Sequence, residues 1–339
     1  MSSRTTTTKE ATADTVSATG LTGASRTMTS AAITAEADGF DPAARVSVNK
    51  AYKMYVGGAF VRSESGRYFQ ERGRGEVGGS ADPLVVNVPR GSRKDARDAV
   101  LAAKNAGDGW ASRTAYNRGQ ILYRLAEVME SRRDELRTSL ERGGAGHHGA
   151  QAAHEVESAI DRAVYYAGFC DKYQALVASL NPVAGPHFGF SWPEPMGVVA
   201  VVAPERPALL GLVSTVLPVI AGGNTCVVIA GSEDARTAVL WCECLATSDL
   251  PGGVVNLLTG QAGEMAPHLA RHREVIAVDA WSDDSELTAA LEREGSGNVK
   301  RVRTHGPEDT ARLATEAGQG LGFIERFLET KTVWHPVGV

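Results

Sequence analysis

Three short apolar runs, each bounded by glycine or proline, constrain the fold of this sequence more than any other feature. The first run is Gly197–Ala203, and similar runs occupy residues 225–229 and 254–258. A strand that is apolar along its whole length is typical of a parallel sheet covered by helices on both faces. Stretches of helical length, about 207–221 and 234–246, separate the runs. The sequence therefore predicts an α/β fold with a doubly wound, mostly parallel sheet.

The sequence predicts further strands and helices before and after these runs. Tyr52 begins a predicted hairpin whose turn is Gly57-Gly58. Ser92 is expected to cap the first helix, with Asp95 assisting three residues later. Further helices are predicted at about 115–140 and 152–177, and further strands at 84–88, 188–192, 275–278 and 299–302.

Composition and charge exclude several kinds of protein. The formal net charge of -5 gives no basis for nucleic acid or an anionic membrane as a partner. No apolar run is long enough to span a bilayer. Four cysteines in 339 residues do not make a disulfide framework, and they fit a reducing cytoplasm. Residues 1–45 are rich in Ser, Thr and Ala and are expected to be a disordered tail, although a wrongly assigned start codon or a targeting extension would also explain them.

Several blocks of the sequence resemble the aldehyde dehydrogenase superfamily, in the family's order and at fitting spacings. The segment YKMYVGGAFVRSESGRYF resembles the family's opening hairpin, and residues 93–136 resemble its first two helices with Trp110 between them. EPMGVVAVVAP, LPVIAGGNTCVV and LPGGVVNLLTG are similar to its first three Rossmann strands and their neighbours. FIERFLETKTVWHPVGV resembles its C-terminal oligomerisation strand.

The resemblance implies a division of the chain. Residues 46–305 would form a degenerate cofactor-binding, Rossmann-like domain with N-terminal helices, and an oligomerisation arm would lie near 184–194. Residues 306–322 would be a linker in place of the family's catalytic domain, because so few residues cannot form such a domain. Residues 323–339 would be the oligomerisation strand.

The sequence departs from the family at the family's catalytic residues, and we predict that this chain has no catalytic residues. The family attacks the aldehyde with a cysteine thiolate, but no cysteine follows Cys244. Cys242 and Cys244 are expected to be packed helix residues. Where the family carries an asparagine that stabilises the oxyanion, this chain has Arg206. The general-base glutamate expected after the last Rossmann strand has no clear match, and His305 stands near its place.

The positions that bind the cofactor in the family are matched only in part by this sequence. The resemblance implies NAD or NADP, with Ser232, Glu233 and Gly260 as weak, vestigial contacts. The family's lysine after the second strand is missing. Its Gly-Ser-Thr turn is replaced by Trp281 and neighbouring acidic residues that would repel a pyrophosphate. Dinucleotide binding is therefore expected to be weak or absent.

No metal site is predicted, because a solvated helix junction explains His147, His148 and His154 more simply. The arm and the C-terminal strand favour a non-catalytic subunit that associates with a full-length aldehyde dehydrogenase or with itself. The alternative is a diverged oxidoreductase that completes its site with a partner chain. A decayed remnant is a third possibility, which the well-patterned apolar strands disfavour.

Overall fold

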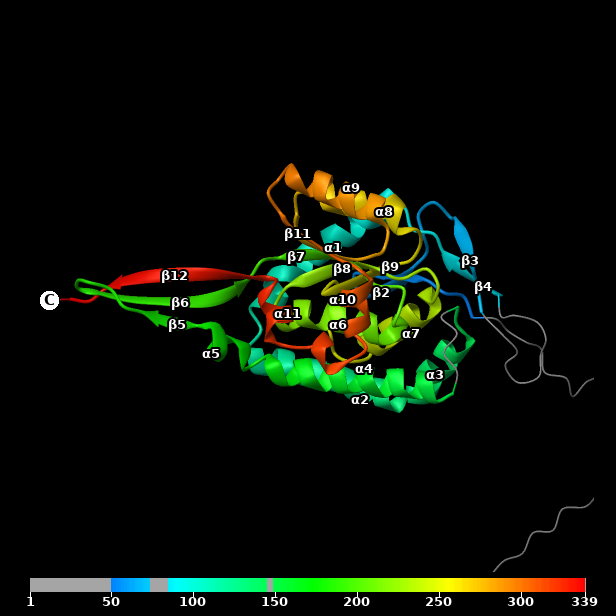
Figure 1. Ribbon diagram of the computed structural model, residues 1–339, viewed down its shortest axis with the longest axis horizontal. Helices are drawn as coiled ribbons and strands as arrows, with labels where there is room; N and C mark the ends of the chain where they lie inside the picture. The colour runs from blue at the N-terminus through cyan, green and yellow to red at the C-terminus, as the bar shows by residue number, and fades with distance from the viewer. Residues whose placement is uncertain (1–49, 74–84, 145–148, 339) are drawn as a thin grey trace, which may run out of the picture. The chain divides into compact units, whose positions relative to one another are not determined.

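A central seven-stranded sheet organises the chain, seen here in a computed structural model that describes residues 50–73, 85–144 and 149–338. The strand order is β11-β10-β7-β8-β9-β1-β2, and the first five strands run parallel (Figure 1). These five are β7 (Val198–Val202), β8 (Thr225–Ile229), β9 (Val255–Leu258), β10 (Val275–Trp281) and β11 (Arg301–His305). The predicted fold class is confirmed.

The central strands of the sheet are apolar on both sides, as is typical of strands in a parallel sheet. Every residue of β7, β8 and β9 is buried. Alternate residues of β7 belong to two different cores, with Val199 and Val201 in one and Val198, Ala200 and Val202 in the other. Each face therefore requires its own layer of helices.

Two helical layers cover the sheet (Figure 1). One layer packs on the side of Val199 and consists of α2 (Ala115–Ser131), α3 (Arg133–Arg142), α4 (Ala150–Phe169), α6 (Ala208–Ala221) and α7 (Ala235–Ala246). The other consists of α1 (Arg93–Ala111), α8 (Ala262–Arg271) and α9 (Ser285–Ser296). This double covering is the doubly wound arrangement expected from the sequence.

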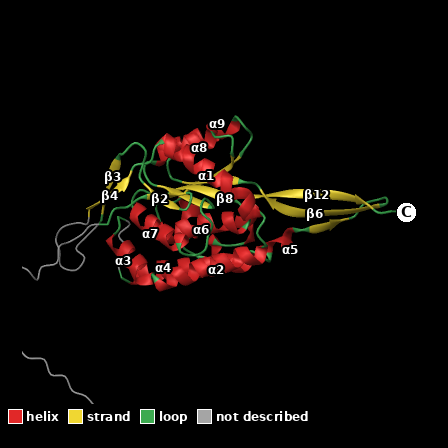
Figure 2. Cartoon of the chain, turned by 180° about the vertical axis from the view of Figure 1, so that it is seen from behind, coloured by secondary structure: helices red, strands yellow, loops and turns green. Residues whose placement is uncertain are grey.

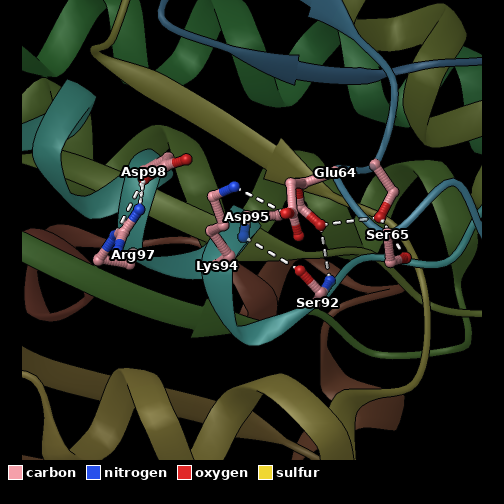
Figure 3. Close-up of polar contacts among 8 residues, drawn as sticks. Glu64, Ser65, Ser92, Lys94, Asp95, Arg97 and Asp98 are labelled. Atoms are coloured by element: carbon pink, nitrogen blue, oxygen red, sulfur yellow. Dashed lines mark hydrogen bonds and ion pairs between the residues drawn. The ribbon is translucent and has the colours of Figure 1, made fainter.

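The first helix begins as predicted. The Ser92 hydroxyl accepts the Asp95 N–H, and the Asp95 carboxylate accepts the Ser92 N–H at 2.8 Å, which completes a capping box (Figure 3). Trp110 does not lie between two helices as expected. It lies in the last turn of α1, where its indole N–H donates to the Ile220 carbonyl and ties α1 to α6.

Two predicted long helices are each divided in the structure. The helix expected at 115–140 is interrupted at Arg132, which has non-helical backbone angles and bonds Glu135 and Glu243 with its guanidinium. The helix expected at 152–177 ends at Phe169, and the short α5 (Tyr173–Val177) follows it. Apolar periodicity continues across both breaks, so the pattern does not reveal them.

The predicted hairpin is confirmed and extends the sheet. Its strands are β1 (Met54–Val56) and β2 (Ala59–Val61), joined at Gly57-Gly58, and β1 pairs antiparallel with β9. A separate antiparallel pair consists of β3 (Tyr68–Arg72) and β4 (Val85–Pro89). Leu84, expected to start β4, lies outside the described residues, as do residues 1–45.

A three-stranded antiparallel sheet extends away from the helices (Figure 2). Its order is β12-β6-β5, from β12 (Leu328–Pro336), β6 (His187–Pro195) and β5 (Ser179–Asn181). β12 pairs with β6 over its whole length, from Leu328 opposite Pro195 to Pro336 opposite His187. We call this the arm sheet; it joins the two segments that the sequence assigned to oligomerisation.

Residues 306–327 connect β11 to β12 and are folded. They contain α10 (Pro307–Arg312), a 3-10 turn at Glu316–Gly318, and α11 (Leu321–Glu325). The buried Arg162 of α4 donates to the carbonyls of Gly318 at 2.7 Å and Thr315 at 3.0 Å. The predicted linker is thus held on the helical layer by a charged side chain, and α11 includes the first residues of the segment expected to be a strand.

Candidate functional site

A cavity of about 660 Å³ lies at the carboxyl ends of the parallel strands. In doubly wound sheets, ligands bind at this edge. The three residues that the sequence assigned to a cofactor, Ser232, Glu233 and Gly260, all line it. The structure therefore brings them together, and their binding role stays a prediction.

Gly260 also has a purely structural reason to be glycine. Its φ is +132°, and a Cβ at this position would lie 2.9 Å from the backbone nitrogen of Gly91. That nitrogen donates to the Thr259 carbonyl at 2.8 Å, which holds the loop before α1 against the end of β9. Close backbone packing thus explains this glycine without a ligand.

Glu205 fills one wall of the cavity. Its carboxylate accepts the Ser232 N–H at 3.0 Å, the Ser232 hydroxyl at 3.1 Å and the Glu233 N–H at 2.9 Å. The Glu233 carboxylate in turn pairs with Arg206 at 2.8 Å. The amides after β8 and the only side chain predicted to bind a ribose are therefore already engaged within the protein. Arg206 is paired as well, rather than directed as an isolated donor.

The first turn of α9 forms another wall of the cavity, and an acidic side chain also caps it. Asp284 accepts the N–H groups of Glu286 at 2.9 Å and Leu287 at 3.0 Å. A helix N-terminus attracts anions through exposed amides and its dipole. Here a carboxylate of the chain takes that position, and Asp283 beside it adds a second negative charge.

A buried aspartate organises the strand ends beneath this wall. Asp279 accepts the indole N–H of Trp281 at 2.6 Å and lies 2.9 Å from Nε2 of His305. The Trp281 and His305 rings stack, with centroids 3.8 Å apart. The other ring nitrogen of His305 lies 3.7 Å from Asp309 of α10. His305, near the place of the expected glutamate, thus joins β10, β11 and the segment that follows.

The four cysteines of the chain are all buried and unpaired with one another. Burial raises the pKa of Cys170 to about 12 and that of Cys244 to about 11, and it also raises the pKa of Cys226 and Cys242. A nucleophilic cysteine needs access and a lowered pKa. The prediction that Cys242 and Cys244 are packed residues of a helix is confirmed, because both lie inside α7.

The predicted histidine cluster is described only in part. His154 is exposed on α4, whereas His147 and His148 lie outside the described residues. Within the described ranges, no group of three His, Cys, Asp or Glu side chains converges as a metal site would require. No helix there is long and apolar enough to cross a membrane.

Sequence reasoning missed the most important feature of the cavity, which is that its amides are capped by acidic side chains of the chain itself. The sequence predicts that the acidic residues next to Trp281 repel a phosphate, but it does not predict the contacts of Glu205. Glu205 and Ser232 are 27 positions apart, so no local pattern signals their contact. The hydrogen bonds from Arg162 to the carbonyls of Thr315 and Gly318 cannot be predicted from the sequence for the same reason.

Three comparisons with known proteins show what this chain is similar to. The profile described as the aldehyde dehydrogenase family matches residues 79–303. Hydroxyisobutyraldehyde dehydrogenase of Mycolicibacterium austroafricanum is 30% identical over 74% of this chain and 47% of its own. Mitochondrial 10-formyltetrahydrofolate dehydrogenase of Mus musculus is 29% identical over 76% of this chain and 28% of its own.

A solved structure gives the same result. The NAD-dependent aldehyde dehydrogenase from Sinorhizobium meliloti superimposes with a TM-score of 0.68 and 26% identity, over 75% of this chain and 50% of that one. The chain thus spans half or less of the length of each of these relatives.

Proposed function

This chain belongs to the aldehyde dehydrogenase family, and on that premise we propose that it is a non-catalytic member that associates with a full-length NAD(P)-dependent aldehyde dehydrogenase. The burial of all four thiols carries the first part of this proposal. A covalent attack on an aldehyde needs an accessible thiolate, and burial holds each thiol in its protonated form. The free cysteines also agree with a reducing compartment, for which we propose the cytoplasm.

The residues that line the cavity also support a non-catalytic role, because they do not suit a dinucleotide cofactor. Four carboxylates line it, from Glu205, Glu233, Asp283 and Asp284, against the single guanidinium of Arg206. The pyrophosphate of a dinucleotide would have to displace Glu205 and Asp284 from amides that they already bind, and would meet negative charge on both walls. These residues do not fit NAD or NADP, so we propose that binding is weak or absent.

The arm sheet supports association with a partner. Leu180 is 72% exposed, Trp334 61% and Phe188 48%, and each belongs to one of its three strands. Tryptophan and phenylalanine side chains are enriched at protein interfaces. β5 and β12 are the edges of the arm sheet, and an edge strand offers main-chain groups to another sheet. A family member of full length is the occupant that we propose.

Co-expression with a full-length aldehyde dehydrogenase from the same organism, followed by native mass spectrometry, tests the proposal. We expect a hetero-oligomer, and we expect Trp334→Ser to weaken it at least tenfold, because truncation of a tryptophan buried in an interface usually costs more than about 1 kcal/mol. The matched control is Leu101→Ser, which removes a side chain that is 57% exposed on α1, outside the arm sheet. A mass spectrum that contains only this chain, alone or as a homo-oligomer, would contradict the hetero-oligomer.

One observation favours the alternative of a diverged oxidoreductase that completes its site with a partner chain. The cavity at the sheet edge remains large enough, at about 660 Å³, for a small molecule. Absorbance of reduced nicotinamide, measured with aldehydes for the chain alone and for the mixture, separates the two functions. Turnover by the chain alone would overturn the non-catalytic proposal, and a gain of turnover in the mixture that requires Glu205 would favour the alternative.

A further inference from the structure

A second cavity, of about 450 Å³, lies between α1 and the end of α8. We propose that it binds a small soluble molecule that carries two or more phosphate groups. Six of its eight lining side chains are basic and none is acidic; they are Arg93, Lys94, Arg97, His268, Arg271 and His272, with Ala96 and Leu269 completing the lining. We call this cavity the basic groove.

The basic groove stands out against the charge of the whole chain, which is -5. The N-terminal residues Ala262 and Gly263 of α8 line the acidic cavity at the sheet edge, whereas its C-terminal residues line the basic groove. One helix therefore separates a cavity lined mainly by acidic side chains from a groove lined by basic side chains. An anion that the first site repels is attracted by the second.

The cations of the basic groove are exposed at the surface, and most of them take part in exposed ion pairs. Arg93 is exposed and makes no ion pair among the residues that the structure describes. Lys94 pairs with Glu64 and Arg97 with Asp98, as Figure 3 shows, and both pairs are largely exposed. Exposed ion pairs contribute little stability, so these cations can exchange their partners for a phosphate.

The remaining arginine comes from the other helix. Arg271 pairs with Glu294 of α9, and the Arg271 side chain is 67% exposed. Arginines on two different helices can each present paired N–H donors to a phosphate. Leu269 and Ala96 provide an apolar floor, and the volume lies in the range of small-molecule sites. These features favour a compact polyanion.

The two histidines of the groove are partly buried and lie near several cations. Burial lowers the pKa of His268, and the charges of Arg93 and Arg271 lower it further against the opposing charge of Glu294. Burial also lowers the pKa of His272, with contributions from Lys300 and Lys104 that oppose Glu274. A bound polyanion would favour the charged imidazolium, so binding should be accompanied by proton uptake.

Titration calorimetry of the full chain with sodium tripolyphosphate tests the proposal. We expect saturable binding by the wild-type chain, and at least a tenfold loss of affinity in the double variant Arg93→Gln, Arg271→Gln. The matched control is Arg142→Gln, which removes an exposed arginine at the end of α3. Undetectable wild-type binding, or an equal loss in the control, would overturn the proposal.

Two further measurements decide between a specific soluble ligand and general attraction of anions. Inorganic phosphate at the same ionic strength should bind at least tenfold more weakly than tripolyphosphate. Phosphatidylcholine vesicles that contain a phosphoinositide should not sediment the chain, and sedimentation without tripolyphosphate binding would assign the groove to a lipid headgroup instead.

Proton uptake supplies a readout that loss of folding does not imitate. Calorimetry in buffers of different ionisation enthalpy should show uptake at about pH 7, and affinity should rise as the pH falls. His268→Gln should reduce the number of protons taken up per bound ligand, whereas His335→Gln, which alters an exposed histidine on β12, should leave that number unchanged. Binding without proton uptake in the wild-type chain would contradict the placement of the ligand beside His268.

Discussion

At the scale of single residues, Arg162 shows how a buried charge can hold a segment in place. Its guanidinium donates to the carbonyls of Leu313, Thr315 and Gly318 and to the Ser214 hydroxyl, and the residue is only 4% exposed. Burial lowers its pKa, and the compensating hydrogen bonds keep the charge tolerable.

We expect Arg162→Met to destabilise the protein by about 3 kcal/mol, because four acceptors lose a charged donor. Urea unfolding followed by tryptophan fluorescence measures the change in the free energy of unfolding. Arg133→Met, which alters an exposed arginine of α3, should change it by about 0.5 kcal/mol or less. Equal effects of the two substitutions would show that the hydrogen bonds of Arg162 contribute nothing to the free energy of unfolding.

The buried thiols predict a loss of stability in alkaline solution. Burial raises the pKa of Cys170 from 9.0 to about 12. The unfolded chain therefore releases this proton above about pH 9 while the folded chain keeps it. The stabilising contribution is fully present below the unfolded pKa and is lost as the pH rises toward the folded pKa.

Each such thiol should lower the free energy of unfolding by about 1.4 kcal/mol per pH unit in this range. Urea unfolding of the wild-type chain and of Cys170→Ala between about pH 8 and pH 11 isolates the contribution of one thiol. The difference between the two chains should change with pH above about pH 9, and parallel curves would contradict a raised pKa.

At the scale of elements, the start of α1 is stabilised by a side chain with several partners. Asp95 accepts the Ser92 N–H at 2.8 Å, the Ser63 hydroxyl at 2.9 Å and the Glu64 N–H at 3.0 Å. This carboxylate therefore fixes both the helix and the loop after β2. The Ser92 side chain makes a single hydrogen bond here, in which its hydroxyl accepts the Asp95 N–H.

We expect Ser92→Ala to cost about 1 kcal/mol and Asp95→Ala about 2 kcal/mol, because the latter leaves three donors without their acceptor. Thermal and urea unfolding measure both changes. Asp98→Ala, on the exposed side of the same turn, should cost about 0.5 kcal/mol or less. If Ser92→Ala were the costlier substitution, the role assigned to Asp95 would be wrong.

At the scale of the whole molecule, the proposed loss of dinucleotide binding has a direct thermodynamic consequence. A ligand stabilises a folded protein in proportion to the logarithm of its concentration relative to the dissociation constant. A site that bound NAD at about 10 µM would add about 2.7 kcal/mol in the presence of about 1 mM NAD. The acidic cavity should add none.

Differential scanning fluorimetry with and without NAD or NADP checks this expectation. We expect an unchanged Tm for the wild-type chain with either dinucleotide, because Glu205 and Asp284 occupy the amides that a pyrophosphate would need. A full-length aldehyde dehydrogenase is the positive control. A rise of several degrees in this chain would show that the carboxylates yield to the cofactor.

The sequence by itself determined the architecture of this protein. The runs at 198–202, 225–229 and 255–258 are apolar at nearly every position, so burial on both faces is the only favourable arrangement for them. The Ser92 cap and the Gly57-Gly58 turn are equally local, and both were predicted correctly. The resemblance to a family added the expectation of a cofactor-binding domain and of cofactor contacts at Ser232, Glu233 and Gly260.

Only the tertiary structure decided what fills the cavity and what holds the chain around it. Glu205 meets the amides after β8, Arg162 meets residues 313–318, and the basic groove joins α1 to α8, in each case across a long sequence separation. Such contacts depend on how packed elements are placed, which periodicity and capping rules do not encode. The break at Arg132 belongs to the same class, because contacts of its side chain with Glu135 and Glu243 override an uninterrupted helical pattern.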